Sequence, residues 1–371
     1  MLQLIFILSI VISLCFYVSK TKNSTTTDIF SDDFDPSKVC MTLNSSGQDQ
    51  SIVLKESSFD TSRIKSYDGE DMKNFEFRPQ NFKQFIGQED AKEKAKTIMS
   101  KARRGIKSHF LVDGIKGHGK TTFVELLAKQ LDAKLIERIG RQIDEDGLVN
   151  IVNEINSSEE EFVVFFIDEF ETMDWKLIKI LNPMIESFKI SGKKIKPFTF
   201  VGATINKHIL LKNNPDTLDR IPPSHHIKFE RYNSEEIKAI LFQYKEQLYG
   251  REIVASQVMD SVSKNCKFNP RTSIALLEDF IIEGDINKVL KNSKIIRDGL
   301  TAKDIDILQA LSMSTRAMGA NALAMKAKLN EKEYITEFEP FLVEYGYIDR
   351  VPSRVITDKG RELLEQLKEI A

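Results

Sequence analysis

One stretch of this 371-residue sequence has the residue types and the spacing that bind phosphate groups. Residues 114–121 match the pattern G-x-x-x-x-G-K-[ST], in which glycines let backbone N–H groups approach a phosphate. An apolar run typical of a buried strand precedes the pattern, and apolar residues at helical spacing follow it. The expected nucleotide-binding residues are Gly114, Ile115, Lys116, Gly117, His118, Gly119, Lys120, Thr121 and Thr122.

Two residues of this stretch have distinct expected roles. Lys120 would reach the β- and γ-phosphates of ATP, and the hydroxyl of Thr121 would bind Mg²⁺. The helix that follows would add the positive end of its dipole. A glycine-rich turn without a ligand is the alternative, and the Lys-Thr pair and both flanking elements count against it.

Two carboxylates follow the most apolar run of the chain, residues 161–167. This composition is typical of a strand buried on both faces of a parallel sheet, and ligands of such sheets bind at the carboxyl ends of the strands. Asp168 would therefore hold Mg²⁺, and Glu169 would orient and deprotonate an attacking water. A strand that ends at a solvated acidic turn is the alternative.

Three more residues are candidates with weaker signals. Thr204 ends a predicted strand over 197–204, where it would lie beside the γ-phosphate or cap the next segment. Arg220 could act as an arginine finger or could be an ordinary exposed arginine. Arg271 lies on the first turn of a helix that Asn269 and Pro270 begin, so it could touch a phosphate.

The whole-chain composition narrows the function little. The 53 Lys+Arg nearly balance the 55 Asp+Glu, so no global basic field indicates or excludes nucleic acid. The three cysteines are far apart and form neither a zinc pattern nor a disulfide framework. The length predicts two or three domains.

The N-terminus predicts a membrane anchor. Leu2 to Val18 is almost entirely apolar and long enough to cross most of a bilayer's hydrocarbon core. Lys20 and Lys22 follow it, which favours a single-pass protein with its body in the cytosol. A cleaved signal peptide is the alternative, although the run lacks a basic start and a small-residue cleavage site. We assign 1–19 to the transmembrane anchor and 20–74 to a flexible linker.

Three domains are predicted beyond the linker: a large α/β domain over 75–231, a helical domain over 232–298 and a terminal domain over 299–371. The terminal domain is predicted to contain three helices, the third over 331–345, and a short hairpin of residues 346–348 and 354–356. This arrangement is typical of a winged helix. Its wing would lay Arg350 and Arg354 along a DNA backbone. A winged helix that contacts protein is the alternative.

Together these residues resemble the RuvB family of AAA+ ATPases, which drive the branch migration of Holliday junctions. The resemblance runs from about Phe77 to near the C-terminus. Its marks are Arg78-Pro79, Ile86-Gly87-Gln88, the P-loop, Asp168-Glu169, the run 197–204, Asn269-Pro270-Arg271 and the run 340–348.

The resemblance implies an α/β P-loop AAA+ domain (a parallel sheet flanked by helices) with an α-helical lid and a C-terminal winged helix. It implies ATP and Mg²⁺ as cofactors, duplex or branched DNA as substrate, and a homo-oligomeric ring that is usually a hexamer. It also implies adenine near Ile86, Thr204 as sensor 1, Arg271 as sensor 2 and Arg220 as the finger acting in trans.

The sequence departs from the family at several points. Ile115-Lys116 stands where the family has Pro-Pro, His118 where it has Leu, and Phe170-Glu171 where it has Ile-His. Residues 187–196 replace a long hairpin that docks RuvA, and their shortness argues against a RuvA-type partner. The anchor and linker have no counterpart in the family.

Three functions from different classes are compatible with these residues. The first is an ATP-hydrolysing motor that acts on DNA in branch migration, recombination or repair. The alternative is a membrane-tethered AAA+ ATPase that remodels a protein partner and uses its winged helix for protein contact. A nucleotide-dependent binding module with little turnover is a third, weaker interpretation.

Overall fold

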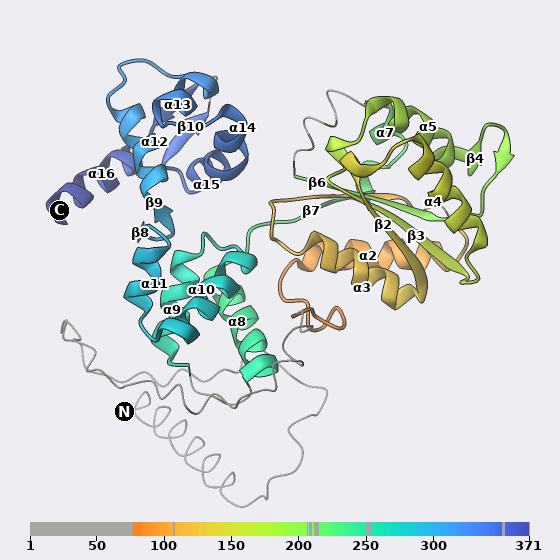
Figure 1. Cartoon of the computed structure of the whole chain (residues 1–371), viewed down its shortest axis with the longest axis horizontal. Coiled ribbons are helices and arrows are strands. Elements are labelled where there is room, and N and C mark those ends of the chain that lie inside the picture. The colour runs from red at the N-terminus through yellow and green to blue at the C-terminus, as the bar shows by residue number, and fades with distance from the viewer. Residues whose placement is uncertain are drawn as a thin grey trace, which may run out of the picture. The chain divides into compact units, whose positions relative to one another are not determined.

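The computed structural model describes residues 77–106, 108–205, 207, 210, 215–249, 254–350 and 353–370. The predicted anchor over 1–19 and the linker over 20–74 lie outside these residues. Within the described residues, no helix has both the length and the apolar character needed to cross a bilayer. The described chain consists of an α/β domain, a helical domain and a winged-helix domain (Figure 1).

A five-stranded parallel sheet forms the α/β domain, in the order β2-β3-β6-β1-β7. Strand β3 lies between β2 and β6, inside the sheet, as expected of residues that are apolar on both faces and buried. The strands are β1 (Phe110–Asp113), β2 (Ala133–Ile139), β3 (Phe162–Asp168), β6 (Thr199–Thr204) and β7 (His226–Lys228).

Helices cover both faces of this sheet (Figure 1). Alternate residues of β3 divide between the two faces: Val163, Phe165 and Ile167 pack with α4 and α5, and Val164 and Phe166 pack with α2 and α3. The helices are α2 (Glu89–Ala102), α3 (Lys120–Leu131), α4 (Glu145–Ser157), α5 (Trp175–Ser187) and the short α7 (Pro215–Asp219). A small hairpin, β4 (Lys189–Ile190) and β5 (Lys193–Lys194), follows α5.

The helical domain has its own buried cluster, formed by residues between Tyr232 and Val289. Asn269 begins α10 as predicted, because its side chain accepts hydrogen bonds from the N–H groups of Arg271 and Thr272. The helices are α8 (Ser234–Tyr249), α9 (Ser256–Asn265), α10 (Pro270–Glu283) and α11 (Ile286–Asn292).

The terminal domain contains the expected helices and wing. Its elements are β8 (Ile295–Arg297), β9 (Leu300–Thr301), α12 (Ala302–Ser312), α13 (Ala320–Lys326), α14 (Glu331–Glu333), α15 (Glu339–Glu344), β10 (Ile348–Arg350), β11 (Arg354–Ile356) and α16 (Asp358–Ile370). The helix predicted over 331–345 is present with an interruption, because a π-helical turn, Tyr334–Phe338, lies between α14 and α15. Pro340 lacks the N–H that a continuous helix would need, which explains the interruption.

Candidate active site

The P-loop joins β1 to α3 in a conformation that depends on its glycines. Gly117 and Gly119 have φ values of 84° and 89°, which L side chains rarely adopt. A Cβ on Gly114 would lie 2.6 Å from the Cβ of Phe229, so a larger residue would clash there. The loop is therefore shaped to turn backbone N–H groups towards the start of α3, as phosphate binding requires.

Lys120 is buried, with 7% of its surface exposed, and holds the loop in place. Its Nζ donates to the carbonyl oxygens of Gly114 (2.7 Å) and Ile115 (3.1 Å). Burial lowers the pKa of Lys120, and the nearby carboxylates of Asp168 and Glu171 oppose this shift. An incoming phosphate would supply the anionic partner that the loop carbonyls do not.

Thr121 and Asp168 lie side by side, as the magnesium prediction requires. The Thr121 hydroxyl donates to Asp168 Oδ2 over 3.3 Å, although 46 residues separate them in the chain. Mg²⁺ prefers oxygen ligands and is usually held by one or two protein side chains together with phosphates and water. This pair fits that donor set. The described residues contain no cluster of three or more acidic, His or Cys side chains that would suit a different metal site.

Glu169 occupies the position expected of a general base, immediately after β3. Its backbone is left-handed (φ 49°), and its side chain is 37% exposed. Oε2 lies 3.7 Å from Nη1 of Arg141, a residue that the sequence did not single out. Gly140 makes room for this turn, because a Cβ there would lie 2.6 Å from the carbonyl oxygen of Glu169. The side chain is partly exposed, and the backbone N–H of Glu169 donates to Oδ1 of Asp168, the predicted Mg²⁺ ligand (2.8 Å).

Thr204 is brought to the same edge of the sheet. It pairs with Asp113 in the β1–β6 register, and its carbonyl oxygen accepts from the N–H of Gly114 (3.1 Å). Glu171, another residue that sequence reasoning missed, lies near this edge. Its Oε1 accepts from the N–H of Ile205 at 3.4 Å, whereas its Oε2 is buried without a hydrogen-bond partner. The substitution of an acid for the family's His at this position was the available signal.

The helical domain closes on the P-loop through α10. Asn269 Nδ2 donates to the carbonyl oxygen of Lys116 (2.8 Å), and a Cβ on Gly117 would lie 3.2 Å from the Cβ of Arg271. Arg271 therefore stands beside the phosphate loop with an exposed side chain. Ile86 packs against the cluster of the helical domain, and its place near the adenine stays a prediction.

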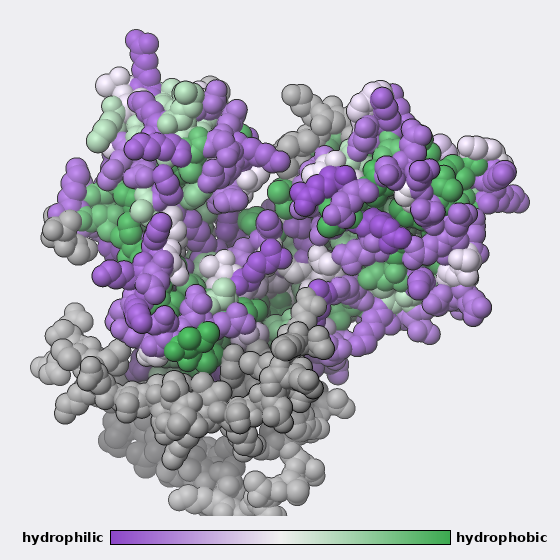
Figure 2. Space-filling model, viewed as in Figure 1, coloured by the Kyte–Doolittle hydropathy of each residue, from purple (hydrophilic) through white to green (hydrophobic). Residues whose placement is uncertain are grey.

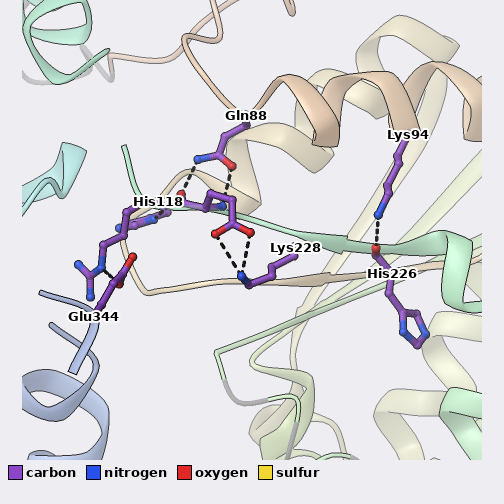
Figure 3. A network of polar contacts seen from close by, with 8 residues as sticks. Gln88, Lys94, His118, His226, Lys228 and Glu344 are labelled. Atoms are coloured by element: carbon purple, nitrogen blue, oxygen red, sulfur yellow. Dashed lines mark hydrogen bonds and ion pairs between the residues drawn. The ribbon is translucent and has the colours of Figure 1, made fainter. Parts of the chain in front are cut away.

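His118 links the P-loop to the segment that leads into the helical domain. Its Nδ1 lies 3.3 Å from the carbonyl oxygen of Glu230, and the Tyr232 hydroxyl donates to the His118 carbonyl (3.2 Å). Gln88 bonds the backbone of Glu230 through both of its amide atoms, at 2.7 and 3.0 Å (Figure 3). Burial lowers the pKa of His118 to about 4, so the ring is neutral at physiological pH.

Arg220 lies apart from the P-loop residues. Its Nε is 3.2 Å from Glu186 Oε2, and its guanidinium also donates to the carbonyl of Asp216. No contact brings it to the nucleotide-binding residues of its own chain within the described residues, as expected of a finger that acts on a neighbouring subunit. That role stays a prediction.

The two wing arginines are both close to one buried carboxylate. Arg354 donates to both oxygens of Glu339, at 2.5 and 3.2 Å, and only 12% of its side chain is exposed. Arg350 Nη1 lies 3.6 Å from Glu339 Oε2, with 57% of its side chain exposed. The Tyr334 hydroxyl also donates to Glu339 (3.1 Å). The sequence prediction of free DNA-binding arginines did not anticipate this cluster.

Comparison with known proteins decides the family. A family model for the Holliday junction DNA helicase RuvB P-loop domain matches residues 77–220, and one for the RuvB C-terminal winged helix domain matches residues 297–365. The chain belongs to the RuvB family of AAA+ ATPases. The two RuvB models together match more than half of it, and a P-loop ATPase domain implies ATP binding.

Curated RuvB proteins and solved RuvB structures agree in extent. The Ureaplasma parvum Holliday junction branch migration complex subunit RuvB is 28% identical over 312 residues, which cover 79% of this chain and 97% of that protein. The Helicobacter hepaticus subunit is 27% identical over 336 residues, covering 81% and 97%. The structure of the Thermotoga maritima RuvB Holliday junction branch migration motor has a TM-score of 0.67 at 26% identity, covering 78% of this chain and 98% of that one.

Proposed function

We propose that this chain is the ATPase subunit of a ring-shaped motor that drives branch migration of Holliday junctions, the activity named for its RuvB relatives. The observation that carries the proposal is the meeting of the P-loop, Asp168, Glu169 and the first turn of α10 at one edge of the sheet. Each element supplies a part that ATP hydrolysis needs, and the winged helix supplies a DNA-binding module.

The residues divide the work of hydrolysis between them. The P-loop backbone and Lys120 would orient the triphosphate, and Thr121 and Asp168 would hold Mg²⁺. When bound, Mg²⁺ neutralises charge on the β- and γ-phosphates. Glu169 would take a proton from the attacking water. Arg220 would leave Glu186 to reach the nucleotide of the neighbouring subunit in a homo-oligomeric ring, a hexamer in this proposal.

Contacts between the domains give hydrolysis a route to the winged helix. Asn269 bonds the P-loop, and Arg231, which follows β7, pairs with Glu344 at the end of α15 (Figure 3). Arg231 also lies over the rings of Phe341 and Tyr345, at 5.6 and 5.9 Å. Movement of the helical domain on nucleotide release would be transmitted through these contacts.

Steady-state ATPase activity tests the proposal. The full chain, purified in mild detergent, is assayed alone, with a four-way junction and with linear duplex of equal length. We expect stimulation by DNA that is greater with the junction. The absence of both DNA binding at low salt and DNA stimulation of ATPase would contradict the motor function.

The alternative, a membrane-tethered ATPase that remodels a protein, is favoured by one observation. Arg350 and Arg354 lie on Glu339, which leaves the wing less positive than its sequence suggests. This alternative expects DNA-independent ATPase activity and a protein client that co-purifies with the chain.

Membrane attachment through residues 1–19, with the body in the cytosol, is a separate part of the proposal. It rests on the apolar run Leu2 to Val18. Membrane fractionation of cells that express the chain with and without residues 2–19 tests it. Recovery of both forms in the soluble fraction would contradict it.

A further inference from the structure

The β4–β5 hairpin is a tight, well-defined turn at the end of α5. Lys189 pairs with Lys194 and Ile190 with Lys193 in an antiparallel register, and Ser191 and Gly192 form the tip with φ values of 47° and 77°. Positive φ at both central residues is the signature of the two-residue hairpin turn that suits the twist of the strands. The Ile195 N–H bonds the Phe188 carbonyl and closes the base of the hairpin (2.8 Å).

The two faces of the hairpin differ in character. Phe188 and Ile190 pack against the core cluster beneath α4 and α5, and Ile195 is buried. Lys189, Lys193 and Lys194 are exposed. Figure 1 shows the hairpin projecting at the edge of the α/β domain, and Figure 2 shows hydrophilic residues at its outermost point with hydrophobic residues behind them. Lys189 and Lys194 lie on the face opposite Ile190, whereas Lys193 is the cross-strand partner of Ile190 and is exposed beside the tip.

The lysines of this hairpin lack a counter-charge. Residues 187–196 contain four lysines and no acidic residue. Lys196 donates to the carbonyls of Ser158 and Glu160, at 2.8 and 2.7 Å. Among the described residues, no ion pair or side-chain hydrogen bond engages Lys189, Lys193 or Lys194. Lys189 and Lys194 face each other directly across the strands, and like charges in such a pair are destabilising.

We propose that Lys189, Lys193 and Lys194 bind the phosphate backbone of the DNA on which the motor acts. The proposal rests on the motor function proposed above. A phosphate between Lys189 and Lys194 would relieve their mutual repulsion, and lysine binds phosphate as a point charge. Two strands of two residues are too small for a stable protein interface, which buries about 800 Å² on each partner. Contact with a few phosphates needs no such area.

The salt dependence of DNA binding tests this site. Binding of the full chain to a labelled four-way junction is measured between 50 and 200 mM NaCl for the wild type and for the variant Lys189→Gln/Lys193→Gln/Lys194→Gln. Each neutralised phosphate contributes about 0.9 to the slope of log K against log salt, so the slope should become less steep by about 2 to 3. ATPase activity without DNA should be unchanged.

The matched control replaces three exposed lysines of the helical domain, Lys264, Lys291 and Lys294, by Gln. The control should keep the wild-type slope. A hairpin variant with the wild-type slope, or an equal change in both variants, would overturn the hairpin proposal and leave the motor function standing. A wild type that binds neither junction nor duplex at 50 mM NaCl would overturn both proposals.

Polyglutamate is a further probe, because an acidic protein would meet the same lysines. If the hairpin variant loses polyglutamate binding but keeps the wild-type slope for DNA, the partner is an acidic protein and the proposal is wrong. If the hairpin variant has a less steep salt slope for DNA but keeps most of its affinity for polyglutamate of equal charge, the assignment to phosphate is supported.

Discussion

Charged side chains gather at two places in this molecule, and they are held differently. At the P-loop, Lys120 donates to two neutral carbonyl oxygens of its own loop, while Glu171 Oε2 and His118 Nε2 are buried without a hydrogen-bond partner among the described residues. At the wing, Arg350 and Arg354 approach Glu339, whose side chain is 2% exposed. Among the described residues Lys120 forms no ion pair, and Asp168 and Glu171 act on it only from a longer distance, whereas Glu339 has two arginine partners at the wing.

This difference separates a ligand site from a structural one. A buried charge whose hydrogen-bond partners are carbonyl oxygens is destabilising, and an anionic ligand would offset the loss of solvation. A buried carboxylate that already has arginine partners contributes to the fold and has little to offer a ligand. The hairpin lysines are exposed, and they resemble Lys120 only in having no ion-pair partner among the described residues. The wing arginines, predicted from sequence to contact DNA, resemble a structural cluster.

The largest expected effect comes from Lys120→Ala. Because Lys120 would bind the phosphates, we expect ATP affinity to fall and ATPase activity to drop by at least about 100-fold, the scale of losing one preorganised charge at a reacting centre. Phosphate release and binding of a fluorescent ATP analogue measure the two effects. Wild-type ATP affinity and wild-type ATPase turnover in this variant would contradict the assignment of this loop as a nucleotide site.

Glu169→Gln tests the candidate general base of the P-loop site. The amide cannot accept the proton of the attacking water, so we expect hydrolysis to fall by about 10²- to 10⁴-fold while ATP binding is kept. Glu145→Gln, which changes an exposed glutamate at the start of α4, is the control and should leave both unchanged. Equal loss of binding and hydrolysis in Glu169→Gln would instead indicate a structural role for Glu169.

The sequence predicted the strands and the site around them for a definite physical reason. Parallel strands end at one edge of a sheet, so Lys120, Thr121, Asp168 and Thr204 could be expected together once β1, β3 and β6 were recognised by their apolar runs. The cap at Asn269 was equally local, since its side chain bonds the N–H groups two and three residues later.

Contacts between distant residues could not be predicted in this way. Glu339 and Arg354 are 15 residues apart, Arg220 and Glu186 are 34 apart, and Arg231 and Glu344 are 113 apart. Periodicity reports which face of an element is buried, not which polar side chain meets which. Helices α5, α11 and α16 and the β8–β9 pair were also not predicted, nor was the hairpin within 187–196 recognised as one.

Glu339→Gln tests the structural side of the comparison. Removing one partner of a buried ion pair leaves the other charge uncompensated, so we expect the free energy of unfolding to fall by about 3 kcal/mol. Glu337→Gln, an exposed glutamate two residues away, is the control and should have little effect. ATPase activity without DNA should be kept in both. Wild-type stability together with tighter DNA binding in Glu339→Gln would mean that the wing arginines are available to DNA. It would contradict a structural role for the cluster around Glu339.

The smallest expected effect is a pH dependence of folding stability that comes from His118, a residue of the P-loop. The pKa of His118 is about 4 in the folded protein and about 6.5 when unfolded, so below pH 6.5 the unfolded chain binds a proton that the folded chain does not. Folding stability from this residue is therefore present above pH 6.5 and is lost as the pH falls towards 4, by about 2 kcal/mol between pH 7.5 and pH 5. Arg231 and Lys120 both disfavour protonation of the ring, and the Glu230 carbonyl favours it.

His118→Leu should remove this dependence, so thermal midpoints of the two proteins should diverge in favour of the variant as the pH falls. Because His225 and His226 also have lowered pKa values, only the difference between wild type and variant reports His118. Parallel midpoints from pH 7.5 to pH 5 would mean that the imidazole takes up its proton in place, with Nε2 donating to a group that the folded chain or a bound nucleotide provides.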